Sequence, residues 1–88
     1  MLVKQSVTLM LQTADRTRKA RVTLPRKMHV SDIVKTSRKR WSLGFGVNYQ
    51  IANLNTGRQL HPEETLTIEN VQDGDTLVLQ PLPTHGRG

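Results

Sequence analysis

The stretch GRQLHPEETLTIENVQDGDTLVL, residues 57–79, decides the fold of this chain. Its last part contains a turn-forming cluster over residues 72–75, where an Asp-Gly step favours a tight reversal. Residues 76–80 follow with alternating threonine, leucine and valine side chains, which suit a pleated strand. This pattern predicts a strand over residues 76–80, with Leu77 and Leu79 pointing into a core.

The beginning of the same stretch predicts a much shorter strand. Residues 55–58 read Asn-Thr-Gly-Arg, which is a composition typical of a tight turn. Gln59-Leu60 follows the turn and is long enough only for a very short strand. Residues 62–70 are then expected to form a loop that is anchored by two apolar side chains, Leu66 and Ile68.

Two further strands are expected near the start of the chain. Apolar and polar residues alternate over residues 3–11 and again over residues 19–24, which is the period of a half-buried strand. The polar link over residues 13–17 is short enough to join them as a hairpin. Pro25 ends the second strand, because proline has no N–H to donate to a sheet ladder.

After residue 29 the apolar period changes to that of a helix. One face carries residues at spacings i, i+3, i+4 and i+7 and an aromatic residue one turn further on: Val30, Ile33, Val34, Ser37 and Trp41. Ser31 is the expected N-cap, with Asp32 near the positive end of the helix dipole. Arg38-Lys39-Arg40 lies at the opposite end, where cations are favoured. Gly44 and Gly46 are expected to end the helix and open a loop.

A third strand, expected over residues 49–52, completes the order strand, strand, helix, strand, short strand, strand. This order predicts an α+β fold with a mixed sheet of four to five strands and one main helix packed across it. The last strand is expected beside the first as a parallel pair joined by a right-handed crossover. We therefore expect one domain over residues 1–80 and an unpaired, flexible tail over residues 81–88.

Residues 57–79 resemble ubiquitin without a gap. The matching segments are Gly57-Arg58-Gln59-Leu60, Thr65-Leu66, Asn70-Val71 and Thr76-Leu77-Val78-Leu79. Over residues 3–41 the similarity is one of pattern, and Trp41 and Gly44-Phe45-Gly46 depart from ubiquitin. The resemblance implies the ubiquitin-like β-grasp fold for the domain.

The chain is also similar to the bacterial ubiquitin-like YukD family, which is associated with type VII secretion. This similarity rests on the helix start at residues 30–34, the aromatic Trp41, and the closing segment over residues 74–79. Members of that family end close to their last strand, whereas this chain continues for nine residues past Leu79. The extension is the best discriminator between a conjugated modifier and a YukD-like interaction module of a secretion or membrane complex.

The resemblance to ubiquitin gives the segment Gly86-Arg87-Gly88 a chemical role. Ubiquitin-like modifiers end in Gly-Gly, because glycine lets the chain enter the narrow channel of an E1-like adenylating enzyme. The resemblance thus implies a bacterial modifier or carrier, served by an E1-like enzyme, an E2-like enzyme and a JAB-type peptidase. Three alternatives remain open: Gly88 is activated with Arg87 in the channel, a peptidase exposes Gly86, or the segment is not conjugated at all.

The net charge of +6 is unevenly distributed along the chain. Residues 1–48 carry eleven Lys and Arg against two acids, whereas residues 49–88 carry two Arg against five acids. Such an excess of cations attracts acidic proteins, anionic membranes or nucleic acid. The expected electrostatic docking face for a partner consists of four hairpin cations, Arg16, Arg18, Lys19 and Arg21. The alternative is that they serve only solubility. Nucleic acid is not the expected partner, because three aromatic residues give no stacking platform.

A second candidate surface follows from the resemblance. Ubiquitin binds its partners through an apolar patch on the exposed face of its sheet. The matching surface of this chain is expected near Ala52, Leu54 and Gln80. Because Gln80 is polar, a different set of partners is expected where the patch is absent.

The sequence contains no recognisable catalytic or metal-binding constellation. There is no cysteine, and the three histidines, His29, His61 and His85, are scattered. Glu63 and Glu64 are expected in a solvated loop, and Ser37 has no histidine or acid at a recognisable spacing. We therefore expect a protein that is not an enzyme and that uses no cofactor or metal.

Location and assembly are predicted only in outline. No apolar run reaches the roughly 20 residues that cross a bilayer. The first six residues lack the apolar stretch of a signal peptide. The expectation is a small cytoplasmic monomer with a single core.

Overall fold

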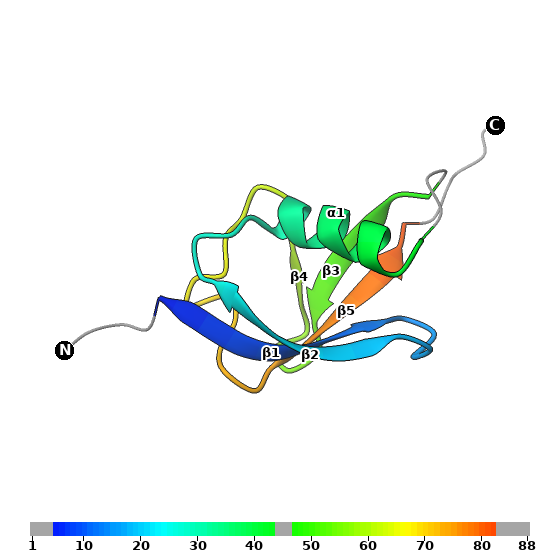
Figure 1. The fold of residues 1–88 in the computed structure, drawn as a ribbon. Coiled ribbons are helices and arrows are strands. Elements are labelled where there is room, and N and C mark those ends of the chain that lie inside the picture. Colours follow the sequence, from blue (N-terminus) through cyan, green and yellow to red (C-terminus); the bar gives the residue numbers. More distant parts are fainter. Residues whose placement is uncertain (1–4, 44–46, 83–88) are drawn as a thin grey trace.

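The computed structural model describes residues 5–43 and 47–82. Within these ranges the chain forms five strands and one helix (Figure 1). In chain order they are β1 (Ser6–Thr13), β2 (Lys19–Pro25), α1 (Val30–Arg40), β3 (Tyr49–Asn53), β4 (Arg58–Leu60) and β5 (Thr76–Pro81). Each corresponds to an element predicted from the sequence. Three predicted features lie outside the described residues: the strand position of Val3, the loop at Gly44 and Gly46, and the segment Gly86-Arg87-Gly88.

The strands form one mixed sheet in the order β2-β1-β5-β3-β4. β5 is parallel to β1, with Leu11 opposite Leu77, and antiparallel to β3, with Ile51 opposite Leu79. The last strand of the chain therefore lies at the centre of the sheet, as predicted. α1 crosses one face of this sheet, and the other face is open (Figure 1).

The hydrophobic core lies between α1 and the face of the sheet that it covers. Its buried members come from every element except β2 and from the loop before β5: Val7, Leu9, Leu11, Val30, Ile33, Ile51, Leu60, Leu66, Val71, Leu77 and Leu79. The inward positions predicted for Leu77 and Leu79 are confirmed, because both are fully buried. Trp41 packs against the edge of this core.

The loop between β4 and β5 is anchored by a different pair of residues from the predicted one. Leu66 is fully buried, as expected, but Ile68 is 47% exposed, so its predicted role as an anchor is wrong. The chain makes a turn after Leu66, where the Val71 N–H donates to the Thr67 carbonyl oxygen at 2.9 Å. This turn directs Ile68 to solvent and places Val71 in the core instead.

The first turn of α1 is capped by backbone from this same loop. The helix starts at Val30, so Ser31 lies inside it and the predicted N-cap role of Ser31 is wrong. His29 occupies the N-cap position but makes no capping hydrogen bond with its side chain. The N–H of Val30 donates to the Glu64 carbonyl at 2.8 Å, and that of Ser31 donates to the Pro62 carbonyl at 3.0 Å. These bonds satisfy donors that a side-chain cap would otherwise serve.

Pairing at the end of β5 continues two residues past the predicted boundary at Gln80. Pro81 lies opposite Tyr49, and the Leu82 N–H donates to the Asn48 carbonyl oxygen at 2.7 Å. Successive residues of a strand direct their backbone groups to opposite sides. The nitrogen of Pro81 therefore faces the side of β1, whose pairing with β5 ends opposite Leu79. The missing N–H of proline costs no ladder bond there.

Candidate partner-binding surfaces

The β1–β2 hairpin ends in a turn that is organised by one carboxylate. Asp15 Oδ1 accepts hydrogen bonds from the Thr13 hydroxyl at 2.7 Å, the Thr17 hydroxyl at 2.8 Å and the Thr17 N–H at 3.0 Å. Arg16, which lies between Asp15 and Thr17 in this turn, has a positive φ of 64°. The hydrogen bonds favour the charged form of the acid, the one from the Thr13 side chain most strongly, and they lower the pKa of Asp15 from 3.8 to about 2.

The lowered pKa of Asp15 gives a direct test of the turn. We expect a carboxyl NMR titration to place it at about 2, and Thr13→Val to raise it toward 3.8. The lowered pKa stabilises the folded turn above pH 3.8, and this stabilisation is lost as the pH falls to about 2. Thr23→Val, elsewhere on the hairpin, is the control and should leave the pKa of Asp15 unchanged. An unchanged value in Thr13→Val would contradict the assigned cause.

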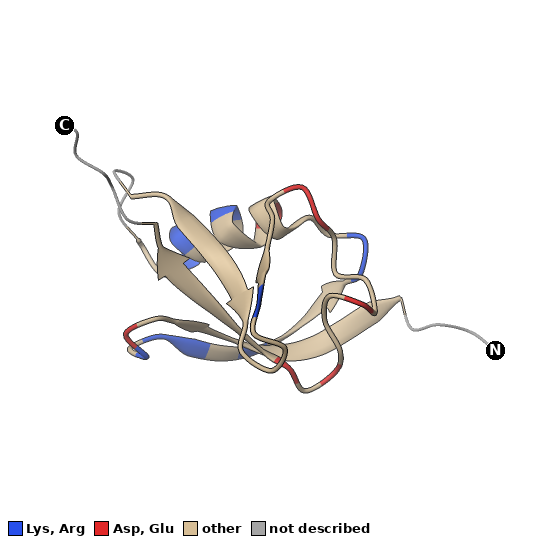
Figure 2. Ribbon diagram, turned by 180° about the vertical axis from the view of Figure 1, so that it is seen from behind, with Lys and Arg blue, Asp and Glu red and all other residues tan. Residues whose placement is uncertain are grey.

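The four predicted docking cations lie together on the hairpin, and all are exposed: Arg16, Arg18, Lys19 and Arg21. The last turn of α1 adds Arg38, Lys39 and Arg40 at the same end of the molecule (Figure 2). We call these seven residues the basic end. The acidic residues that follow β4 lie on other parts of the surface (Figure 2). The molecule therefore carries its positive charge largely at one end.

The basic end lies near the point where the chain leaves β5. The N–H of Ala14, at the start of the hairpin turn, donates to the Leu79 carbonyl oxygen at 3.0 Å. On the helix side, the Arg38 guanidinium lies 5.9 Å from the centre of the Tyr49 ring, and Tyr49 is the partner of Pro81 in the sheet. Sequence reasoning assigned the Arg38-Lys39-Arg40 cluster to the helix dipole alone and missed its place beside the hairpin. The predicted parallel pairing of β1 with β5 was the signal that places the hairpin turn beside the end of β5.

The positions that match the apolar patch of ubiquitin share the open face of the sheet. Ala52 lies opposite Val78, and the N–H of Leu54, just beyond β3, donates to the Thr76 carbonyl at 2.9 Å. Leu54 is 53% exposed. Gln80 lies opposite Gln50 on the same face. The structure therefore brings Ala52, Leu54 and Gln80 onto neighbouring strands, apart from the basic end.

Glutamine side chains interrupt the apolar character of this face. The Gln59 amide donates to Gln50 Oε1, and the Gln50 amide lies 3.4 Å from Gln80 Oε1. These contacts form a row of amides across β4, β3 and β5. This amide row adds hydrogen-bonding groups to the face of the sheet that carries Ala52 and the exposed side chain of Leu54.

Of the two acids predicted in a solvated loop, Glu63 and Glu64, the second makes polar contacts within the fold. Glu64 accepts a hydrogen bond from the His61 N–H at 2.7 Å and lies 3.6 Å from the Arg58 guanidinium. Among residues 5–43 and 47–82, no group of three or more His, Cys, Asp or Glu side chains is arranged to hold a metal ion. The same residues include no helix long and apolar enough to cross a membrane.

Comparisons with known proteins agree on the fold. No protein-family model matches the chain, and no curated protein matches it by sequence. Among solved structures, the ubiquitin of Caldiarchaeum subterraneum has a TM-score of 0.71 at 20% identity, with 92% of this chain and 99% of that chain covered. The C-terminal ubiquitin-like domain of mouse tubulin-specific chaperone e has a TM-score of 0.69 at 18% identity, with 93% of each chain covered. The UBL domain of Plasmodium falciparum Dsk2 has a TM-score of 0.68 at 19% identity, with 88% of this chain and 99% of that chain covered. Identities this low establish the fold alone, and the chain therefore has the ubiquitin-like β-grasp fold.

Proposed function

We propose that this protein is a ubiquitin-like modifier or carrier whose C-terminal segment is activated by an E1-like adenylating enzyme and conjugated to a target. The observation that supports this most directly is the way β5 ends. Its last paired residue, Leu82, is fixed to Asn48 by a 2.7 Å hydrogen bond, and Gly86-Arg87-Gly88 follow within six residues. Six residues can extend at most about 20 Å, which is enough to carry a carboxylate from the folded domain into an enzyme channel.

The chemistry requires only a carboxylate and room around it. The E1-like enzyme would join the carboxylate to the α-phosphate of ATP with release of pyrophosphate, and a thiol would then displace AMP. Neither step needs a catalytic group from the carrier. Glycine at position 86 or 88 keeps side chains away from the reacting carbon. The basic end beside the exit of β5 favours an enzyme whose docking surface is acidic.

The conjugation site can be identified from the tryptic remnant on the target lysine. Trypsin cleaves after Arg87, so conjugation through Gly88 leaves a single glycine. No Lys or Arg lies between Gln59 and Gly86, so conjugation through Gly86 leaves residues 59–86. Thr84→Arg shortens that second remnant to His85-Gly86. We expect one of these remnants after incubation of the tagged protein with ATP and a lysate of its source cells.

Two controls accompany this experiment. Omission of ATP should abolish the adducts, and so should truncation after Leu82, which keeps every paired residue of β5. Circular dichroism should show that the truncated protein is folded. Absence of adducts both from the full chain and from a chain ending at Gly86 would overturn the conjugation proposal.

A second candidate is a non-conjugated interaction module of the YukD type. It is supported by the likeness to two structures that are, by their names, ubiquitin-like domains. In this case truncation after Leu82 should leave partner binding and cellular function intact. Retained function in the truncated protein would favour the module over the modifier.

A further inference from the structure

An apolar groove lies between α1 and the strands β3 and β4. It has a volume of about 320 Å³, which falls within the range of ligand pockets in proteins. Its lining includes three buried side chains, Val30, Ile51 and Leu60, and two half-buried ones, Val34 and Tyr49. We call this groove the α1–β3 groove. It offers apolar surface to a segment of chain laid along α1.

The described part of the chain ends in the wall of this groove. Leu82, the last residue that the structure describes, contributes to the lining and is 37% exposed. Its N–H donates to the Asn48 carbonyl oxygen at 2.7 Å, which fixes its backbone beside β3. Residues 83–88 therefore begin next to the apolar lining, and no other segment of this chain that lies outside the described residues starts there.

The α1–β3 groove continues into an open hollow at the start of α1. The groove and the hollow share Ser31, His61 and Pro62 in their linings. The hollow adds two carboxylates, those of Asp32 and Glu63. A segment that follows the groove from the end of β5 toward the start of α1 therefore passes from an apolar to an acidic surface.

The two carboxylates can accept a cation. Within residues 5–43 and 47–82, the Glu63 side chain takes part in no hydrogen bond or ion pair. Asp32 Oδ2 lies 4.0 Å from the His29 ring, and about half of each side chain is exposed. Because both carboxylates line the same hollow, one guanidinium placed there would be attracted by both.

The C-terminal segment carries a guanidinium at a suitable position. Arg87 is the only Lys or Arg among residues 83–88, and it follows Leu82 by five residues, which span at most about 17 Å. α1 has 11 residues and a length of about 16 Å. Arg38, in the last turn of α1, stands 5.9 Å from the Tyr49 ring, so the chain leaves β5 near the end of α1. The segment is therefore long enough to bring Arg87 to the acids at the start of the helix.

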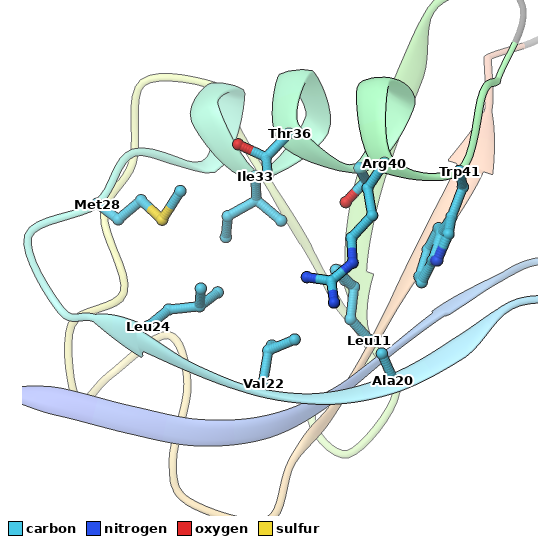
Figure 3. A pocket seen from close by; sticks show the side chains of 10 residues that line it. Leu11, Ala20, Val22, Leu24, Met28, Ile33, Thr36, Arg40 and Trp41 are labelled. Carbon is cyan, nitrogen blue, oxygen red and sulfur yellow. The ribbon is translucent and has the colours of Figure 1, made fainter.

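The opposite side of α1 does not suit the same segment. The hollow between α1 and β2 has a volume of only about 60 Å³, and Arg40 reaches from α1 toward β2 at one end of it (Figure 3). Arg40 and the other cations of the basic end would repel a further arginine. Charge complementarity therefore favours the α1–β3 groove for this segment.

We propose that residues 83–88 fold back along the α1–β3 groove and that Arg87 pairs there with Asp32 and Glu63. In this arrangement the groove withholds the C-terminal carboxylate from an enzyme channel. Hydrolysis of the peptide bond after Gly86, with water as the second reactant, would release the dipeptide that carries the cation and free a segment that ends in glycine. This consequence for activation rests on the proposed function, whereas the docking of the segment does not.

A spin label on the full-length protein tests the docking. The sequence has no cysteine, so Gly88→Cys provides a single attachment point for a nitroxide. We expect the label to broaden the NMR signals of the Ser31, Asp32 and Glu63 amides most strongly. Broadening that is greatest at the β1–β2 turn, or evenly weak over the folded domain, would overturn the proposal. No activating enzyme is present, so a failure here is distinct from a failure to form adducts.

Arg87→Glu in the labelled chain tests the charge pairing. It replaces attraction by repulsion, so we expect the paramagnetic broadening at Asp32 to fall about threefold to tenfold. Glu63→Arg added to Arg87→Glu should restore the broadening. Glu69→Gln, which neutralises an exposed acid outside the groove in the same loop, is the matched control for Glu63→Gln and should change nothing. Unchanged broadening in Arg87→Glu, or no recovery in the double variant, would contradict the pairing.

Discussion

Leu66→Ala is expected to lower the free energy of unfolding by about 2–5 kcal/mol. Leu66 lies in the loop between β4 and β5, yet its side chain is fully buried. Its N–H donates to the Arg26 carbonyl at 2.9 Å, and its own carbonyl accepts from the Arg26 guanidinium at 2.9 Å. These bonds hold the backbone in place, so the loop cannot collapse to fill the cavity that the substitution leaves. Urea unfolding followed by circular dichroism measures the loss.

Ile68→Ala, in the same loop, provides the control for Leu66→Ala. Ile68 is 47% exposed and lies outside the buried core, so we expect a loss below about 1 kcal/mol. The two substitutions remove similar numbers of carbon atoms from aliphatic side chains two residues apart. Equal losses would show that burial of Leu66 does not anchor the loop.

Asn53→Ala is expected to lower the free energy of unfolding by about 2–4 kcal/mol, because it removes three hydrogen bonds made by a fully buried side chain. The Asn53 amide nitrogen donates to the Asn70 carbonyl and to Asp75 Oδ2, each at 2.9 Å, and its amide oxygen accepts from the Asn55 N–H at 2.9 Å. One fully buried side chain thus joins the end of β3 to both ends of the turn before β5.

Asn48→Ala is the matched control for Asn53→Ala. Asn48 is exposed, and its part in the sheet is played by its backbone carbonyl, which the substitution keeps. We expect its midpoint in urea to stay close to that of the unchanged protein. A midpoint for Asn53→Ala that also stays there would show that the asparagine network adds no stability.

The period of the apolar residues was enough to predict the strands and the helix face, and the order of the elements predicted the central position of β5. It failed where an element depends on a distant segment. The cap of α1 comes from carbonyl groups of Pro62 and Glu64, which no local pattern around Ser31 reveals. Pro81 can pair with Tyr49 because the pairing of β1 with β5 ends before it, opposite Leu79. This could be predicted only from the order of the strands in the sheet. The exposure of Ile68 depends on a turn that the residue spacing does not show.

The same holds for the candidate surfaces: features within one local element were predicted, and features that depend on tertiary packing were missed. The hairpin cations were predicted from their spacing, because a hairpin is a local structure. Tertiary packing places the last turn of α1 at the same end of the molecule as the hairpin cations, and this turn carries Arg38, Lys39 and Arg40. Asn53 is polar and gave no signal in an apolar pattern.

The central position of β5 has a consequence for how the protein is made. Translation produces β1 first and β5 last, yet the two are direct neighbours, and β5 also separates β1 from β3. Until residue 81 has left the ribosome, a nascent chain can form the β1–β2 hairpin but cannot close the sheet. Contacts of such long sequence separation form late and slowly. A ribosome that stops early therefore releases an unfolded chain, open to proteolysis, and every folded copy has been synthesised through the strand that leads to Gly86.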